Sequence, residues 1–105
     1  MEIKIENIGT TLVVKPSGEL DHHTAANLKE VLDREIDTHN IVNMILDFDK
    51  VTFMDSSGIG VIVGRYKQIS ARGGKVMVIR VNPQVDKIFE ISGLKKILDF
   101  GKEQK

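Results

Sequence analysis

Apolar and polar side chains alternate in the N-terminal part of the chain. Ile3 and Ile5 are separated by charged residues, and a second stretch rich in β-branched residues covers positions 11–15. A period of two is typical of half-buried strands. Because the turn-forming residues 7–10 lie between the two stretches, the pattern predicts an antiparallel β-hairpin.

Three later segments have the 3.6-residue period of amphipathic helices. The first predicted helix has its apolar positions within residues 25–36 and can be capped by Asp21 or Thr24. The apolar stripe of the second lies within residues 59–69. The third starts at residues 82–83, where an asparagine suited to the N-cap is followed by a proline.

Short, mostly apolar runs lie between and after these helices, at residues 41–46, 75–79 and 97–100. Such runs are typical of strands in a sheet that is covered by helices. The predicted order is β-β-α-β-α-β-α-β, which favours one α/β domain. Its mixed sheet has parallel βα units, right-handed crossovers and the antiparallel hairpin at the N-terminus. The domain is expected to span residues 1–105, with a polar C-terminal tail at 100–105.

Composition narrows the classes of function. The 105 residues suit a single domain, and 15 basic against 15 acidic residues leave a formal net charge of zero. We therefore expect no nucleic-acid partner, because binding to a phosphate backbone needs a positive field. No apolar run approaches the roughly 20 residues of a membrane span. Since the first residues also lack a signal-peptide core, we expect a cytoplasmic protein without membrane contacts.

Candidate chemistry lies in the segment Asp55-Ser56-Ser57-Gly58, at the start of the second predicted helix. Unpaired backbone amides and the positive end of the helix dipole meet at such a position, and both stabilise a phosphate. Aspartate and serine are also the ordinary caps of helices. The pattern alone leaves two interpretations open: a plain helix cap, or a serine that is phosphorylated.

Glycines are unusually frequent in the first turns of this helix. Gly58, Gly60 and Gly64 each cost about 0.8–1 kcal/mol relative to alanine. Gly60 and Gly64 are four residues apart and share one side of the helix. That side either lets a partner protein approach closely or packs tightly within the domain. Val61 points away from the predicted apolar stripe, and we expect it in solvent beside the serines.

Other functional patterns are weaker. The glycine spacing G-x-G-x-x-x-G is close to a dinucleotide fingerprint, and a small-ligand or nucleotide-binding module is therefore the alternative function. The spacing is weak evidence, because these glycines do not directly follow a strand. Asp47 and Asp49 stand where receiver domains carry a phosphorylated aspartate, but the other residues of such a site are missing, and we expect two solvated loop aspartates. His22 and His23 point about 100° apart on a helix, which disfavours a metal site. No catalytic residue is predicted.

Two stretches resemble the signature sequences of a known family. Residues 18–25, GELDHHTA, and residues 53–62, FMDSSGIGVI, are similar to those of the bacterial anti-sigma factor antagonists, which are STAS domains. Residues 64–68 and 91–94 extend the resemblance over essentially the whole chain. A scaffold or a transporter appendage is another role of STAS domains, and the lack of membrane spans in the sequence speaks against the transporter.

The resemblance implies a regulatory protein and not an enzyme. In this family the unphosphorylated antagonist binds an anti-sigma factor that is also a serine kinase, and so frees a sigma factor; the match indicates sigma F in sporulation. The kinase uses ATP to phosphorylate the first serine of the run, Ser56, and a serine phosphatase reverses the reaction. The chain itself would need no cofactor. The implied partner-binding residues are Asp21, His22, Asp55, Ser56, Ser57, Gly58, Ile59, Gly60 and Val61.

Overall fold

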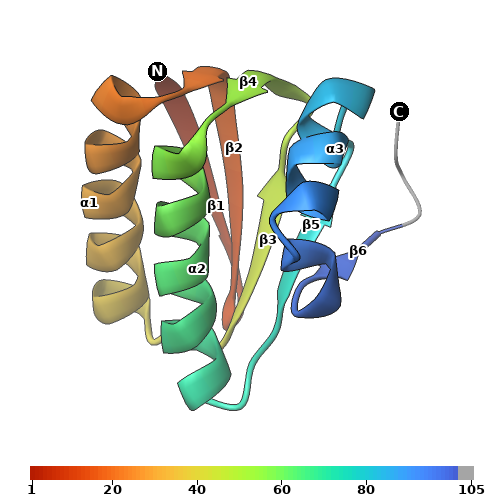
Figure 1. Cartoon of the computed structure of the whole chain (residues 1–105). Coiled ribbons are helices and arrows are strands. Elements are labelled where there is room, and N and C mark those ends of the chain that lie inside the picture. Colours follow the sequence, from red (N-terminus) through yellow and green to blue (C-terminus); the bar gives the residue numbers. More distant parts are fainter. Residues whose placement is uncertain (102–105) are drawn as a thin grey trace.

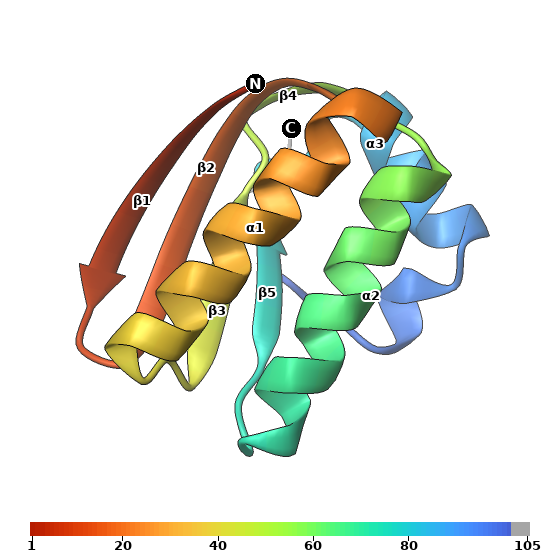
Figure 2. The same cartoon turned by 90° about the vertical axis from the view of Figure 1, so that its left-hand side faces the viewer.

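The computed structural model describes residues 1–101. These residues form a six-stranded sheet, and helices α1, α2 and α3 lie side by side on one of its faces (Figures 1 and 2). Buried apolar side chains from both layers make up a single core. The elements are β1 (Glu2–Ile8), β2 (Thr11–Leu20), α1 (His22–His39), β3 (Asn43–Asp47), β4 (Lys50–Met54), α2 (Ser56–Ala71), β5 (Val76–Ile79), α3 (Pro83–Ile91), the 3-10 turn η1 (Leu94–Lys96) and β6 (Asp99–Phe100).

Strand β2 is the longest strand and organises the sheet. On one side it forms an antiparallel pair with β1. On its other side it forms parallel pairs, with β3 along its first half and with β4 along its last residues. The change of partner occurs between Val14 and Ser17, and the register of the pairing with β4 shifts after Gly18, where φ is +107°. Such a backbone conformation favours glycine. The ends of β2 and β4 are consequently neighbours, with Leu20 opposite Met54.

The predicted fold class is confirmed by the hairpin, the helices and the parallel strands beyond β3. The predicted helix starts are also confirmed, and the structure decides between the two cap candidates for α1. Asp21 caps α1, and Asn40 ends it in the left-handed conformation. Asn82 caps α3, Pro83 is its first residue, and Gly93 follows its end with φ of +80°.

Strand β4 is absent from the predicted order, which is therefore wrong at this point. The segment does not have the alternating burial of a half-buried strand, since Val51 and Met54 are buried whereas the two residues between them are exposed. It is only five residues long, and its pairing partner lies about thirty residues earlier in β2. A short strand that depends on a distant partner gives little periodicity of its own.

The C-terminal strand is shorter than predicted. The turn η1 precedes it, and only two residues pair with β5. Phe100 packs on Phe89, with ring centroids 5.2 Å apart. Position 100 therefore belongs to the folded domain and not to a polar tail, while residues 102–105 of that predicted tail lie outside the described residues.

Candidate docking site at the start of helix α2

Helices α1 and α2 begin next to each other at one edge of the sheet (Figures 1 and 2). The residue that follows each of the paired positions Leu20 and Met54 is the N-cap of a helix. The backbone amide of Asp55 donates a hydrogen bond of 3.2 Å to the carbonyl oxygen of Leu20 and ties the two starts together. Asp21, Asp55 and the first turns of both helices therefore form one surface.

Both aspartates cap their helices with one carboxylate oxygen. Oδ1 of Asp21 accepts hydrogen bonds from the amides of His23 and Thr24, at 2.9 and 3.1 Å. Oδ1 of Asp55 accepts from two amides of the first turn of α2, at 2.8 and 3.4 Å. Within residues 1–101, neither Oδ2 makes a hydrogen bond. Capping therefore leaves one oxygen of each carboxylate for a partner, so capping and docking are compatible roles.

The Asp21 carboxyl is held in its charged form. Its pKa is lowered, chiefly by the hydrogen bond from the Thr24 amide and also by the one from the His23 amide, while partial burial opposes this effect. Hydrogen bonds to a carboxylate favour the ionised state. At neutral pH this position consequently presents a negative charge.

Ser56 is the first residue of α2 and its side chain is exposed, whereas Ser57 is half-buried. The amides of Ser57 and Gly58 are already bonded to Asp55, which corrects the expectation that they are unpaired. A phosphate on Ser56 would therefore not be held by these amides. It would stand in solvent, close to the Asp55 carboxylate.

The three glycines of α2 have different surroundings. A Cβ atom on Gly58 would lie 2.7 Å from Cγ of Leu20 and 2.8 Å from Cγ of Met54. Gly58 is therefore required by the packing of α2 against the ends of β2 and β4. A Cβ on Gly60 or Gly64 would meet nothing within 4 Å. Tight packing within the domain is thereby excluded at Gly60 and Gly64, and approach by a partner protein stays a prediction.

Val61 is not in solvent. Its side chain is 7% exposed and belongs to the core, so the expected position beside the serines is wrong. Arg65, one turn later on the same side of α2, forms an ion pair with Asp33 of α1 at 3.3 Å. That side of α2 therefore faces α1, and Val61 cannot contact a docking partner in this conformation. Two other proposed contacts lie in the first two turns: Ile59 is half-buried, and Gly60 is exposed.

The sequence pattern predicted that Asp47 is a solvated loop residue, and this prediction is wrong. Asp47 ends β3, is 3% exposed, and accepts hydrogen bonds on both carboxylate oxygens from the guanidinium of Arg80. Oδ1 of Asp47 also accepts from the amide of Asp49 at 3.1 Å. Because β3 and β5 are paired, this ion pair between a buried carboxylate and a partly exposed guanidinium joins the ends of two neighbouring strands.

The remaining sequence candidates give no further site. His22 and His23 are both exposed at the start of α1, and residues 1–101 contain no cluster of three or more potential metal ligands. The amides at the start of α2 that could bind a nucleotide phosphate are bonded to Asp55. No helix within the described range has the length and apolar character needed to cross a bilayer.

A groove beside the serines escaped the sequence analysis. It lies between β4 and α3, has a volume of about 310 Å³, and is lined by apolar side chains that include Phe53, Val85, Ile88 and Ile91. Phe53 is 47% exposed and Ile91 is 73% exposed. The sequence contains no signal for Phe53: β4 was not predicted, and a period of two would place Phe53 on the same side as the buried Val51, whereas the structure exposes it.

Comparisons with known proteins place this geometry in a family. The STAS domain family matches residues 2–104. The anti-sigma F factor antagonist of Paenibacillus polymyxa is 42% identical over 93% of this chain and 84% of its own length. The anti-sigma-B factor antagonist of Listeria monocytogenes is 34% identical over 79% of this chain and 72% of its own length.

Solved structures agree with this assignment. The unphosphorylated form of the anti-sigma factor antagonist SpoIIAA superposes with a TM-score of 0.77 at 25% identity, over 96% of this chain and 88% of that one. The phosphorylated form of the Bacillus cell fate determinant SpoIIAA superposes with a TM-score of 0.76 at 29% identity, over 97% and 93% of the two chains. The chain belongs to the STAS domain family. Within that family it groups with the anti-sigma factor antagonists, which are regulatory proteins and not enzymes.

Proposed function

We propose that this protein is a cytoplasmic switch in which Ser56 carries the regulatory phosphate. The unphosphorylated form binds an anti-sigma factor with serine kinase activity and so frees a sigma factor. The kinase then transfers the γ-phosphoryl group of ATP to the Ser56 hydroxyl, releasing ADP, and a serine phosphatase hydrolyses the phosphoserine. The observation that carries the proposal is the exposed Ser56 at the shared start of α1 and α2. The 42% identity to one anti-sigma F factor antagonist supports sigma F as the target, whereas the 32% identity to a second one and the 34% identity to the anti-sigma-B factor antagonists do not separate the two systems.

Release of the partner follows from electrostatics. A phosphoserine adds about −1.5 to −2 charges at pH 7. When Ser56 is seated in the kinase, this charge lies near the phosphates of the bound nucleotide as well as near Asp55. Two unit charges about 4 Å apart repel by about 4 kcal/mol at the effective dielectric of a protein surface. Half of that energy weakens binding more than tenfold.

Only a local conformational change is then needed. The amides that could draw the phosphate inward are occupied by Asp55, so a phosphate on Ser56 gives the helix no new internal bond. We expect backbone NMR shifts to change around residues 54–60 and the adjoining start of α1. Shift changes spread over β5 and β6 would contradict the electrostatic explanation.

The decisive experiment uses purified anti-sigma F factor and ATP, with the phosphate mapped by mass spectrometry. We expect one phosphate on the wild type and on Ser57→Ala, the matched control, and none on Ser56→Ala. Ser56→Ala should bind the anti-sigma factor and resist release by ATP, while Ser56→Asp should bind at least tenfold more weakly. A phosphate elsewhere, or wild-type affinity of Ser56→Asp, would refute the proposal. Parallel titration with anti-sigma-B factor tests the choice of sigma factor.

A further inference from the structure

An apolar groove continues the candidate docking surface toward α3. Four large apolar side chains are exposed among residues 1–101, and two of them, Phe53 and Ile91, line this one groove. Isolated exposed apolar residues are ordinary, but neighbouring ones around a hollow are typical of an interaction site. The groove has about 310 Å³ of space, enough for one or two large side chains.

The groove and Ser56 are parts of the same rigid stretch of chain. Phe53 is three residues before Ser56, and Met54, which also lines the groove, lies under Gly58 at the start of α2. On the other wall, Nδ2 of Asn82 donates a hydrogen bond of 2.9 Å to the carbonyl oxygen of Val51 and fixes the start of α3 to β4. A protein that covers Ser56 therefore reaches the groove without any rearrangement.

Charge along this surface changes sign. Asp21 and Asp55 lie at the α1–α2 end, and Lys87 stands on the rim of the groove at the α3 end. Within the described range, the Lys87 ammonium takes part in no ion pair. Its neighbour Asp86 is paired with Lys95 at 2.8 Å, on the opposite flank of α3.

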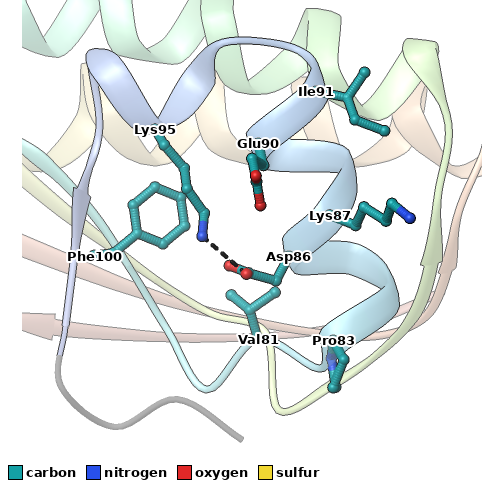
Figure 3. A pocket seen from close by; sticks show the side chains of 8 residues that line it. All are labelled: Val81, Pro83, Asp86, Lys87, Glu90, Ile91, Lys95 and Phe100. Carbon is teal, nitrogen blue, oxygen red and sulfur yellow. Dashed lines mark hydrogen bonds and ion pairs between the residues drawn. The ribbon is translucent and has the colours of Figure 1, made fainter.

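Figure 3 makes this division of α3 visible. Lys95 and Phe100 close one flank of the helix, where the ammonium of Lys95 lies 5.5 Å from the centre of the Phe100 ring. Lys87 and Ile91 extend from α3 in the direction away from Phe100, and they line the hollow drawn in this view as well as the groove toward β4. The flank of α3 that faces β4 is thus left with an unpaired cation and an exposed aliphatic side chain.

We propose that the anti-sigma factor inserts an apolar side chain into the groove formed by Phe53, Ile88 and Ile91 and places a carboxylate opposite Lys87. The proposal rests on the proposed function, because it assigns the same partner to a second part of the same surface. Its charge pattern requires a partner surface that is basic toward Asp21, apolar in the centre and acidic toward Lys87. The phosphate on Ser56 would act on one end of this interface and leave the groove contacts unchanged.

The test measures binding of purified anti-sigma F factor in the presence of ADP, which cannot donate a phosphoryl group. Ile91→Asp should weaken binding at least tenfold, because a charge would enter a desolvated pocket. Lys87→Glu should weaken it several-fold and reduce its dependence on salt. The matched controls, Ile8→Asp and Lys75→Glu, alter exposed residues at the opposite end of the sheet and should stay within about twofold of the wild type.

A kinetic measurement separates docking from the presentation of Ser56. With ATP, Ile91→Asp should raise KM for phosphorylation and leave kcat unchanged, since the groove contributes equally before and during phosphoryl transfer. Suppose that the wild type binds and is phosphorylated on Ser56, and that Ile91→Asp binds with the same affinity. The groove would then not be a docking site, and the proposed function would stand. Failure of the wild type to bind or to be phosphorylated on Ser56 would overturn both. If Ile91→Asp loses self-association but keeps its affinity for the anti-sigma factor, the groove is occupied by a second copy of this chain, and the proposal is refuted.

Discussion

Gly58 offers a sharp test of how α2 is seated against the sheet. In Gly58→Ala the new methyl group would lie 2.7 Å from Leu20 Cγ and 2.8 Å from Met54 Cγ. Both Cγ atoms lie only two bonds from the backbone, and the side chains of Leu20 and Met54 are 0% and 2% exposed, so these atoms have little freedom to move. Overpacking of this kind costs about 1–3 kcal/mol.

Gly60→Ala is the matched control, because it adds the same methyl group to the same helix in open space. Alanine is favoured over glycine by about 0.8–1 kcal/mol in a helix interior, and both variants share this gain. Gly60→Ala should therefore be more stable than the wild type by up to about 1 kcal/mol. Gly58→Ala should be about 1–3 kcal/mol less stable than Gly60→Ala, because the shared gain cancels in the comparison.

Urea denaturation followed by far-UV circular dichroism measures the difference, provided that the slopes of the three proteins agree. In thermal unfolding, each 1 kcal/mol corresponds to about 4–8 °C for a domain near this size. Equal stability of the two alanine variants would refute the packing explanation for Gly58. Binding gives an independent reading of Gly60: a more stable Gly60→Ala that binds the anti-sigma factor less well would place the partner against the bare side of α2.

Four further substitutions test the buried charges and a cap. Arg65 is 6% exposed and paired with Asp33, so in urea unfolding Asp33→Ala should cost about 3 kcal/mol, whereas Arg65→Met should cost about 1 kcal/mol or less. Asp47→Ala should cost about 1–3 kcal/mol, because Arg80 is partly exposed and can be hydrated when the carboxylate is removed; a neutral effect would contradict the ion pair between β3 and β5. The pKa of Asp21 is lowered on folding, so its contribution is complete above the ordinary carboxyl pKa and is lost as the pH falls through the lowered value. Unfolding midpoints of Asp21→Asn should therefore depend less on pH in acid than those of the wild type.

Local chemistry explains which parts of the fold could be predicted. Asp21 and Asn82 are residues that cap helices well in any context. Asn82 was placed correctly and Asp21 was one of two candidates for its helix, because a cap depends on the amides next to it. The apolar period likewise identified the helices themselves. What the period could not provide was the rotation of α2, because the buried side of that helix is set by α1 as well as by the sheet. Val61 was therefore assigned to solvent, although it lies in the core.

Non-local pairing accounts for the other errors. Asp47 looks like a loop residue until Arg80, more than thirty positions later, is brought beside it by the pairing of β3 with β5. Strand β4 exists because the end of β2 supplies its hydrogen-bonding partner. The groove at Phe53 follows from β4 and α3 together. Each of these features depends on two segments that are distant in the sequence, and no periodicity in one segment reports on the other.

The unpredicted strand is also what gives the candidate switch its shape. Without β4 beside β2, Asp21 and Ser56 would belong to unrelated loops. With it, the hydrogen bond between the Asp55 amide and the Leu20 carbonyl fixes two helix starts in one surface, and Met54 joins that surface to the groove. We therefore expect a phosphate on Ser56 to act through its own charge on the partner that covers it, so that added salt weakens the release of the partner, as it weakens any electrostatic repulsion between exposed charges.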